Sequence, residues 1–324
     1  MIKVDACNDM KTARALWQRH WPSNCLFDLW PVRSCFQSHF RYDPHFLVAS
    51  RGNRICGLLA LSWIDEEHCF GHFPGEIWHG KTWLEQNKIV AADAEAVGAL
   101  MDHIPPGTHL RYLCRDGRMD FGNRAREDET GYLFYPSHYG YDIDNYWNAF
   151  NGKSRKKIRR EMESLEEGGV TFRHDRLGDL DMMFRLNVER YQSGSYFADA
   201  RFLQSFQDLA AWLHANDMLR ITTVLIGGKV AAVDMGAVWN DTYTVLAGGT
   251  DADFTGVAKL INLHHLKWAC ERRMRVVDFL CGDFNWKQRF HLTPRSLYQI
   301  WTPPALETWH ATPVWSSRFA ACAV

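Results

Sequence analysis

The stretch from Arg220 to Phe290 constrains the fold of this chain more than any other. It reads as three strands joined by two tight turns, followed by a loop, a long helix and one more strand. Gly227-Gly228 and Asn240-Asp241 are two-residue hairpin signals, and the runs they join are rich in Val, Ile, Thr and Tyr, as strands tend to be. A meander that switches to loop, helix and strand places a helix N-terminus beside the end of a strand, where anions bind readily.

Composition excludes several classes of protein. With 324 residues the chain is long for one core, so we expect two domains. The net charge is -1, from 37 basic and 38 acidic residues, which does not indicate a nucleic-acid partner. The 9 cysteines are scattered and form no CxxC pair, which argues against a zinc or redox motif. We expect a cytoplasmic protein without a membrane anchor, because no apolar run approaches about 18 residues and no apolar leader is present.

Both halves of the chain predict the same order of elements. In the first half we expect helices at 9–20, 31–40 and 91–103, and strands at 45–50, 54–63, 69–73, 109–114 and 131–135. In the second half, helices at 155–167, 180–192 and 200–216 and a strand at 170–174 precede the final helix and strand of the opening stretch. This similarity predicts a duplicated fold, with domains at 1–145 and 146–302 and a Pro-rich strap at 303–324.

The loop after the third meander strand is a candidate anion site. Gly248-Gly249 ends the strand, 251–255 is polar, and Gly256-Val257-Ala258 enters the helix. Small residues let backbone N–H groups approach an anion such as a pyrophosphate, and the helix dipole favours the negative charge. The alternative is an ordinary Gly-containing loop. Neither GxGxxG nor GxxxxGK[ST] occurs, so classical dinucleotide or P-loop binding is not supported.

Three stretches carry a family resemblance: SRKKIRREMESLEEGG at 154–169, AGGTD at 247–251 and VDFLCGDFNWKQRF at 277–290. With the order of elements around them, they resemble the GNAT acyltransferase superfamily. The resemblance is to its FemAB-like branch, in the group with acetyltransferases linked to cellulose or exopolysaccharide synthesis, and it covers roughly residues 150–300. It implies an α/β (α+β) fold of two tandem GNAT-like domains, each a mixed, mostly antiparallel sheet flanked by helices, the first domain degenerate and on the acceptor side.

The resemblance also implies where an acyl-CoA donor binds. The donor would lie between two splayed parallel strands, 242–249 and 275–281, with its pantetheine arm along the first strand and its pyrophosphate at the helix N-terminus. The implied donor-binding residues are Leu246, Ala247, Gly248, Thr255, Gly256, Val257, Ala258 and Lys259. The usual loop pattern Q/R-x-x-G-x-G/A is kept only in its final Gly-x-Ala, and Asp253 stands at the Q/R position, where it would repel a phosphate.

A basic helix is the second candidate anion site. Ser154 is expected to cap this helix, so that Arg155, Lys156 and Lys157 occupy its first turn, where each cation opposes the helix dipole at a cost of about 0.3–1 kcal/mol. Arg159 continues the run. An anionic partner would explain this placement, and we expect Arg155, Lys156 and Arg159 to bind CoA phosphates, an anionic sugar or tRNA. The alternative is a solvated basic face.

Acylation of an amine needs a group that accepts its proton. Asp234 lies in the apolar strand VAAVDMGAV, where a carboxylate is costly unless it is paired or faces a cleft. Asp283 and Lys287 follow the last strand, and Tyr243 begins the third meander strand. Lys287 matches a lysine of the family pattern and is expected either to position substrate or to close the fold. These four residues are the catalytic candidates.

Two more groups complete the candidates. Tyr191 and Tyr196 lie in a polar break between two helices, where acceptor-binding loops often occur. His264 and His265 are adjacent on the long helix and are expected to be core or surface histidines rather than metal ligands. We expect no metal.

The resulting functional prediction is an N-acyltransferase, in the first instance an acetyltransferase. It would move an acyl group from acyl-CoA to an amine such as an amino sugar or a small amine. One alternative is a FemAB-like, aminoacyl-tRNA-dependent peptidyltransferase, which the basic helix supports and the neutral net charge opposes. The other is a non-catalytic GNAT-like binding protein, which Asp253 supports.

Overall fold

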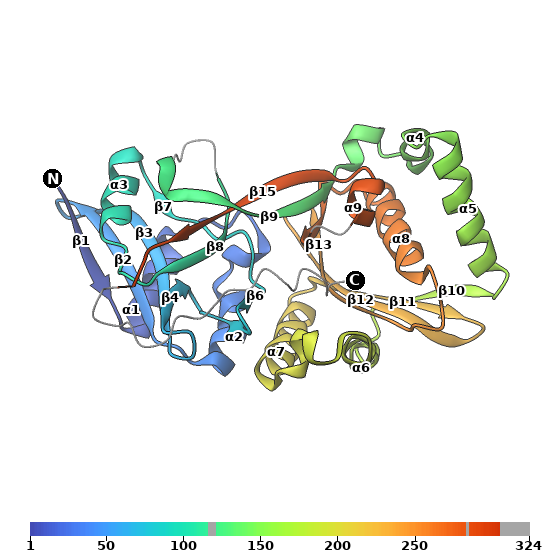
Figure 1. The fold of residues 1–324 in the computed structure, drawn as a ribbon, viewed down its shortest axis with the longest axis horizontal. Coiled ribbons are helices and arrows are strands. Elements are labelled where there is room, and N and C mark those ends of the chain that lie inside the picture. Colours follow the sequence, from blue (N-terminus) through green and yellow to red (C-terminus); the bar gives the residue numbers. More distant parts are fainter. Residues whose placement is uncertain (116–120, 283–284, 305–324) are drawn as a thin grey trace. The chain divides into compact units, whose positions relative to one another are not determined.

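The computed structural model describes residues 1–115, 121–282 and 285–304 (Figure 1). Within these ranges the chain forms two compact units. The first comprises Met1–Thr130, Gln204–Leu209 and the described residues from Ser296 on. The second comprises Gly131–Leu203 and Ala210–Arg295. No helix among the described residues is long and apolar enough to cross a membrane.

The first unit is built on an antiparallel sheet with the order β1-β2-β3-β4. Two helices connect β1 to β2, and a third follows the strands. The elements are β1 (Ile2–Cys7), α1 (Met10–His20), α2 (Trp30–Phe40), β2 (Pro44–Arg51), β3 (Arg54–Ile64), β4 (Cys69–His72), β5 (Ile77–Trp78), β6 (Lys81–Thr82), β7 (Val90–Ala91), α3 (Ala94–Asp102) and β8 (His109–Leu113).

The second unit is built on a sheet with the order β10-β11-β12-β13-β14-β9. All neighbours in it whose register is defined are antiparallel except β13 and β14, which are parallel. The elements that lie wholly or partly in this unit are β9 (Ala125–Phe134), α4 (Ile143–Asn148), α5 (Gly152–Glu166), β10 (Val170–His174), α6 (Asp179–Tyr191), α7 (Ala200–Ala215), β11 (Leu219–Ile226), β12 (Lys229–Trp239), β13 (Thr242–Thr250), α8 (Val257–Glu271), β14 (Val276–Cys281), α9 (Asn285–Arg289) and β15 (Thr293–Trp301). Parts of β9, α7 and β15 belong to the first unit.

Apart from inserted short elements, the two units share one order of elements: strand, two helices, three strands, helix, strand. In the first unit this series runs from β1 to β8, and in the second it runs from β10 to β14. The parallel pairing of β13 with β14 has a counterpart in the parallel bridge between Phe70 of β4 and Thr108, next to β8. The predicted fold class, mixed α/β with sheets flanked by helices, is therefore confirmed.

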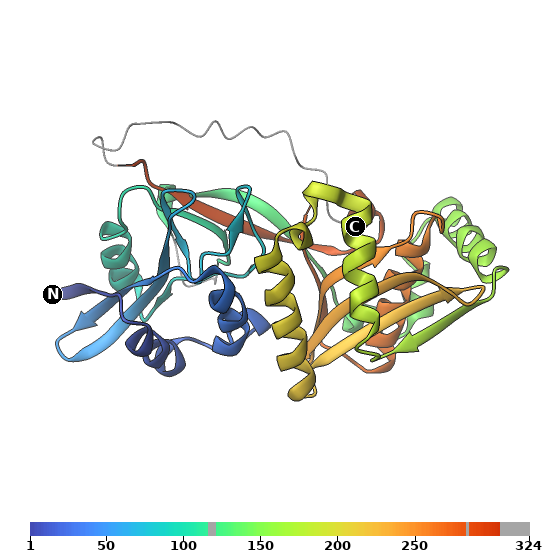
Figure 2. The same cartoon turned by 90° about the horizontal axis from the view of Figure 1, so that it is seen from below.

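Helices cover both faces of the sheet in the second unit. Figure 1 shows α5 and α8 on one side of β10–β13, and Figure 2 shows α6 lying across the opposite face. The helix α6 approaches β13 closely at Gly249, where a Cβ atom would lie 2.4 Å from the carbonyl oxygen of Met183. Only a glycine allows this approach, which holds α6 against the strand that ends at the predicted donor loop.

Candidate active site

The strands β13 and β14 separate after a short parallel pairing. They pair at three positions only: Thr242 with Val276, Tyr243 with Val277 and Thr244 with Asp278. Beyond Thr244, β13 continues to Thr250 along β12, and among the described residues no strand pairs with its other edge. An unpaired edge can accept an extended ligand as an added strand. This is the splayed arrangement that the sequence resemblance implied.

A β-bulge lies on the open part of β13. Met235 of β12 is opposite Ala247, whereas the next residue, Gly236, is opposite Val245, so that Leu246 has no partner across the ladder. A bulge bends its strand and changes the direction of its backbone groups. The predicted donor-binding residues Leu246, Ala247 and Gly248 therefore lie where β13 leaves the regular sheet.

The helix α8 begins without a side-chain cap. Gly256 is its N-cap residue, with a left-handed φ of 93°, and no acidic residue occupies the first turn. The first amides of a helix have no partner within the helix, so this end of α8 can take up an anion. The amides of Val257 and Lys259 already donate to the carbonyls of Phe254 and Gly256 at 3.1 and 3.0 Å, which leaves the Ala258 amide for such a ligand. Asp253 is exposed in the preceding loop, where its amide donates to Oδ1 of Asp251 at 2.9 Å.

In the first unit, β8 and the start of α3 correspond to β14 and the start of α8, and other residues of the chain already bond to both. Asn87 lies against β8: its amide donates to the Tyr112 carbonyl at 3.0 Å, and its carbonyl accepts from the Cys114 amide at 2.8 Å. The N-terminus of α3 is also occupied, because Asp93 accepts from the Ala96 amide at 2.9 Å and Glu95 lies in the first turn. Asn87 therefore pairs with β8, the counterpart of β14, whereas no described strand pairs with the edge of β13 beyond Thr244.

A buried polar network lies beside that edge. Oδ2 of Asp234 is 2.9 Å from Nε2 of His265, whose Nδ1 is 3.4 Å from the Tyr243 hydroxyl. A Cβ atom on Gly248 would be 2.2 Å from Oδ1 of Asp234, so this oxygen lies directly over the glycine. Burial raises the pKa of the Tyr243 hydroxyl far above its ordinary value, which keeps the phenol protonated. Two catalytic candidates, Asp234 and Tyr243, thus meet through His265.

Arg220 extends the network on β11. Its guanidinium lies 3.8 Å from the ring centroid of Trp268, and its Nε and Nη2 have no hydrogen-bond partner within the described structure. Burial lowers the pKa of this guanidinium, and its charge also faces the Tyr243 ring at 6.0 Å. Sequence reasoning missed Arg220 and Trp268, because a cation–aromatic pair between a strand and a helix leaves no local pattern.

Residues 152–288 match the family model for the acetyltransferase (GNAT) domain. The match begins at α5 and includes β13, α8 and β14. No curated protein sequence matches the chain significantly.

Solved structures of low sequence identity share the fold along most of the chain. A conserved protein of unknown function from Bacteroides thetaiotaomicron has 14% identity and a TM-score of 0.56, with 92% of this chain and 99% of that chain covered. A protein named FemX has 10% identity and a TM-score of 0.54, covering 91% and 96%. L-PGS from Bacillus licheniformis has 12% identity and a TM-score of 0.53, covering 93% and 94%. At such identities these similarities establish the fold alone.

Within the matched GNAT segment, Lys287 closes the end of β14. Its Nζ donates to the carbonyl oxygens of Phe279, Leu280 and Cys281 at 2.9, 3.2 and 2.8 Å. The side chain is buried, so these bonds hold the strand end in place. Of the two roles expected for Lys287, these contacts fit closing of the fold rather than positioning of the substrate. Asp283, the other candidate in this region, lies outside the described residues.

The basic helix α5 begins earlier than predicted. Its N-cap is Asn151, which accepts from the Ser154 amide at 2.9 Å, so the expected cap at Ser154 is wrong. The reason is that Gly152 and Lys153 continue the helix backwards by one turn. Two candidate cations face α4: Arg155 donates to Asn148 at 3.2 Å, and Arg159 lies 5.5 Å from the Trp147 ring centroid.

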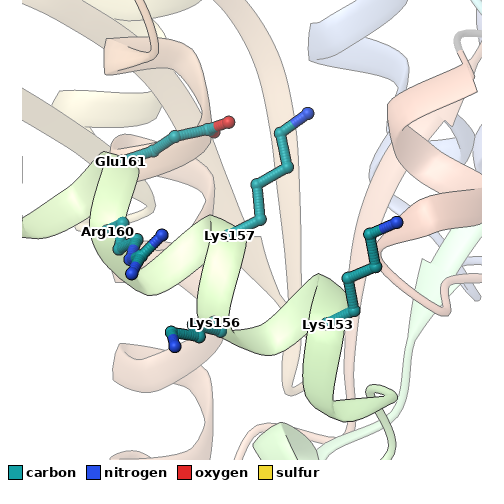
Figure 3. A pocket seen from close by; sticks show the side chains of 5 residues that line it. All are labelled: Lys153, Lys156, Lys157, Arg160 and Glu161. Atoms are coloured by element: carbon teal, nitrogen blue, oxygen red, sulfur yellow. The ribbon is translucent and has the colours of Figure 1, made fainter.

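Lys156, the third candidate on α5, lines a pocket of about 390 Å³ (Figure 3). Its other lining residues are Lys153, Lys157, Arg160 and Glu161. Lys259, a predicted donor-binding residue in the first turn of α8, forms an ion pair with Glu161. The helix α5 and the start of α8 are thus neighbours in this segment.

The polar break between α6 and α7 also reaches β13. Tyr191 is the last residue of α6, and Tyr196 lies in a 3-10 turn with its ring 5.0 Å from that of Phe202. Between them, Ser195 donates to Asn187 at 2.7 Å, and Asn187 donates to the Gly248 carbonyl at 2.6 Å. Among the described residues, no group of three His, Cys, Asp or Glu side chains is arranged to hold a metal ion.

Proposed function

We propose that this protein is an N-acyltransferase that uses acyl-CoA, with acetyl-CoA as the first candidate donor. The observation that carries the proposal is the open edge of β13 beyond Thr244, next to the uncapped N-terminus of α8. An extended pantetheine arm can pair with such an edge, and a pyrophosphate suits such a helix end. The match of residues 152–288 to the GNAT domain supports this assignment.

The donor site is assigned to the second unit for a structural reason. In the first unit Asn87 pairs with the edge of β8, and carboxylates occupy the start of α3. An acyl-CoA there would have to displace part of the chain and bring phosphates near Asp93 and Glu95. The proposal therefore gives the first unit no role in donor binding.

The proposed reaction is direct transfer. The amine nitrogen attacks the thioester carbonyl carbon, a C–N bond forms, the C–S bond breaks, and CoA leaves as a thiolate, which finally takes the proton that the amine has lost. A backbone amide on the open edge of β13 polarises the carbonyl oxygen. The amine proton passes to a carboxylate, for which Asp234 is the first candidate because its Oδ1 lies over Gly248 and has no donor in the described structure. Asp283 is the second candidate.

The acceptor is proposed to be an amino sugar or another small amine. Tyr191 and Tyr196 are its candidate contacts, since they flank Ser195 and the hydrogen bonds that lead through Asn187 to Gly248. This arrangement brings polar side chains of the α6–α7 connection to the strand that carries the donor.

Thermal unfolding with and without acetyl-CoA tests the proposal. A ligand that binds only the folded state stabilises it by about 2.7 kcal/mol at 100 times its Kd, so the melting temperature is expected to rise. Ala258→Glu should abolish the rise, because a carboxylate in the first turn suits the helix but repels a pyrophosphate. Ala258→Gln, of similar shape and neutral, should retain it. Absence of a shift at millimolar acetyl-CoA would refute the donor assignment.

A second candidate function is an aminoacyl-tRNA-dependent transfer. It is favoured by the four cations of the α5 pocket and is compatible with the fold shared with FemX. Phosphate contacts make tRNA affinity fall steeply with salt. A filter-binding titration with tRNA at 50 and 200 mM salt distinguishes the candidates, since only this second one predicts tight binding that is lost at the higher salt.

A further inference from the structure

A charged stripe runs along the exposed face of α5 to its C-cap residue. The stripe consists of Lys153, Lys156, Arg160, Glu163 and Glu167, at the spacing i, i+3, i+7, i+10 and i+14, which keeps these side chains on one side of the helix. All of them are exposed, and they lie on the side away from the buried Met162. Figures 1 and 2 show α5 along the outer side of the second unit.

The charges of the stripe are separated along the helix, with the basic residues first and the acidic residues last. No acidic residue lies in the first turn of α5 and no basic residue in the last, so each end carries the charge that the helix dipole disfavours. Lys156 and Arg160 are like charges four residues apart, which repel one another. The same holds for Glu163 and Glu167. The stripe therefore destabilises its own helix at both ends.

None of the charges of the stripe is neutralised within the described part of the chain. No ion pair joins any of them to another described residue, and Arg160 does not pair even with Glu163 at i, i+3. Other charged residues of α5 do have partners in the unit, as Glu161 has in Lys259 of α8. Within one chain, the charges of the stripe face only solvent.

An anionic ligand would suit only half of the stripe. It would bind the basic half, but it would be repelled by Glu163 and Glu167 and would leave them opposed to the helix dipole. A second copy of α5 that lies antiparallel suits both halves, because its acidic end faces the basic end and its dipole runs in the opposite direction.

One register of two antiparallel copies pairs opposite charges throughout. Where Arg160 lies opposite Glu163 of the second copy, Lys156 lies opposite Glu167, since both pairs share one midpoint along the helix. A two-fold axis through this midpoint forms each of the two pairs twice.

We propose that two copies of this protein associate through the charged stripe of α5, with the two helices antiparallel about a two-fold axis. The proposal does not depend on the proposed function. Exposed ion pairs contribute little individually and are screened by salt, so we expect a weak association, with a Kd in the micromolar range, that is lost at high salt.

Sedimentation velocity at about 0.1 mM protein, well above a micromolar Kd, measures the association. The wild-type protein is expected to sediment as a dimer in about 10 mM salt, where the Debye length is about 30 Å. In about 1 M salt, where the Debye length is about 3 Å, it is expected to sediment as a single chain.

Charge exchange on the stripe tests the antiparallel arrangement. The acidic variant Lys156→Glu, Arg160→Glu and the basic variant Glu163→Lys, Glu167→Lys should each stay a single chain in low salt, because like charges then face each other. An equimolar mixture of the two variants should form a dimer, and a variant with all four changes should dimerise again by itself. Both exchanges place charges as the helix dipole favours, so we expect both variants to fold, which circular dichroism checks.

The control variant Arg185→Glu, Lys267→Glu changes the net charge by the same amount as the acidic variant. Both positions are exposed, on α6 and α8, and this control should dimerise like the wild-type protein. A wild-type protein that stays a single chain in low salt would overturn the proposal. A dimer that persists in high salt, or in both exchange variants, would overturn it as well, because it would use another surface. Exchange variants that stay single chains when mixed would rule out the antiparallel contact.

Discussion

Oδ2 of Asp234 lies 2.9 Å from Nε2 of His265, and both side chains are buried between β12 and α8. This contact explains how a carboxylate is tolerated in the otherwise apolar strand VAAVDMGAV. It also fixes Oδ1 of Asp234 over Gly248, since the other carboxylate oxygen is held by the histidine. The same pair therefore supports the core and orients the candidate base.

Substitution of His265 tests the structural half of that statement. His265→Ala leaves a buried carboxylate without its partner, and the free energy of unfolding is expected to fall by about 3–5 kcal/mol. His265→Gln retains a side-chain N–H donor and should lose clearly less. Urea unfolding followed by tryptophan fluorescence measures both. A loss below about 1 kcal/mol for His265→Ala would show that Asp234 does not depend on this contact.

Substitution of Lys287 distinguishes its two roles. Lys287→Met leaves the carbonyls of Phe279, Leu280 and Cys281 without their donor, and each unsatisfied group costs about 1–3 kcal/mol. We expect urea unfolding to show a loss of about 3 kcal/mol or more. Lys267→Met, at an exposed position of α8, should stay within about 0.5 kcal/mol of the wild-type protein. A stable Lys287→Met protein that has lost only transfer activity would instead assign the lysine to the substrate.

The stability of the first unit is expected to depend on pH through His72. Burial, reinforced by the charge of Arg33, lowers the pKa of His72 to about 3, whereas an unfolded histidine titrates near 6.5. Below about 6.5 the unfolded chain therefore binds a proton that the folded chain does not, and the free energy of unfolding falls as the pH falls. The full contribution is present above this value, and its loss ends near pH 3.

His72→Gln removes this titration. Between pH 7 and pH 5 the variant should lose about 2 kcal/mol less stability than the wild-type protein, from about 1.4 kcal/mol per pH unit. Urea unfolding at the two pH values measures the difference. Identical pH dependence in both proteins would show that His72 titrates normally in the folded state.

The sequence predicted elements well where local signals were strong. Gly227-Gly228 and Asn240-Asp241 set the two hairpins of the meander, and both turns lie where they were expected. The strand Ile2–Cys7 was missed although its residues from Ile2 to Ala6 alternate between apolar and polar, and none of its residues is buried. The strand Thr293–Trp301 was missed because most of its residues are exposed or partly exposed and its pairing with β8 is a long-range contact.

The candidate site was predictable in part. The open edge of β13 followed from the order of elements and the family resemblance, whereas the partner of Asp234 did not, because His265 is 31 residues away on another element. The sequence showed that α5 is rich in basic residues, but it did not show on which face of the helix each of them lies. The contacts of Arg155 and Arg159 with α4 direct these two away from the pocket, and a run of basic residues carries no information about such a neighbour.

Hydrogen–deuterium exchange with and without saturating acetyl-CoA tests the central claim most directly, because it locates the ligand on the chain. We predict slower exchange in peptides covering residues 245–259, where the pantetheine and pyrophosphate would bond to backbone amides, and unchanged exchange in residues 84–96 of the first unit. Unchanged exchange throughout 245–259 at saturating ligand, or protection confined to the first unit, would contradict the account.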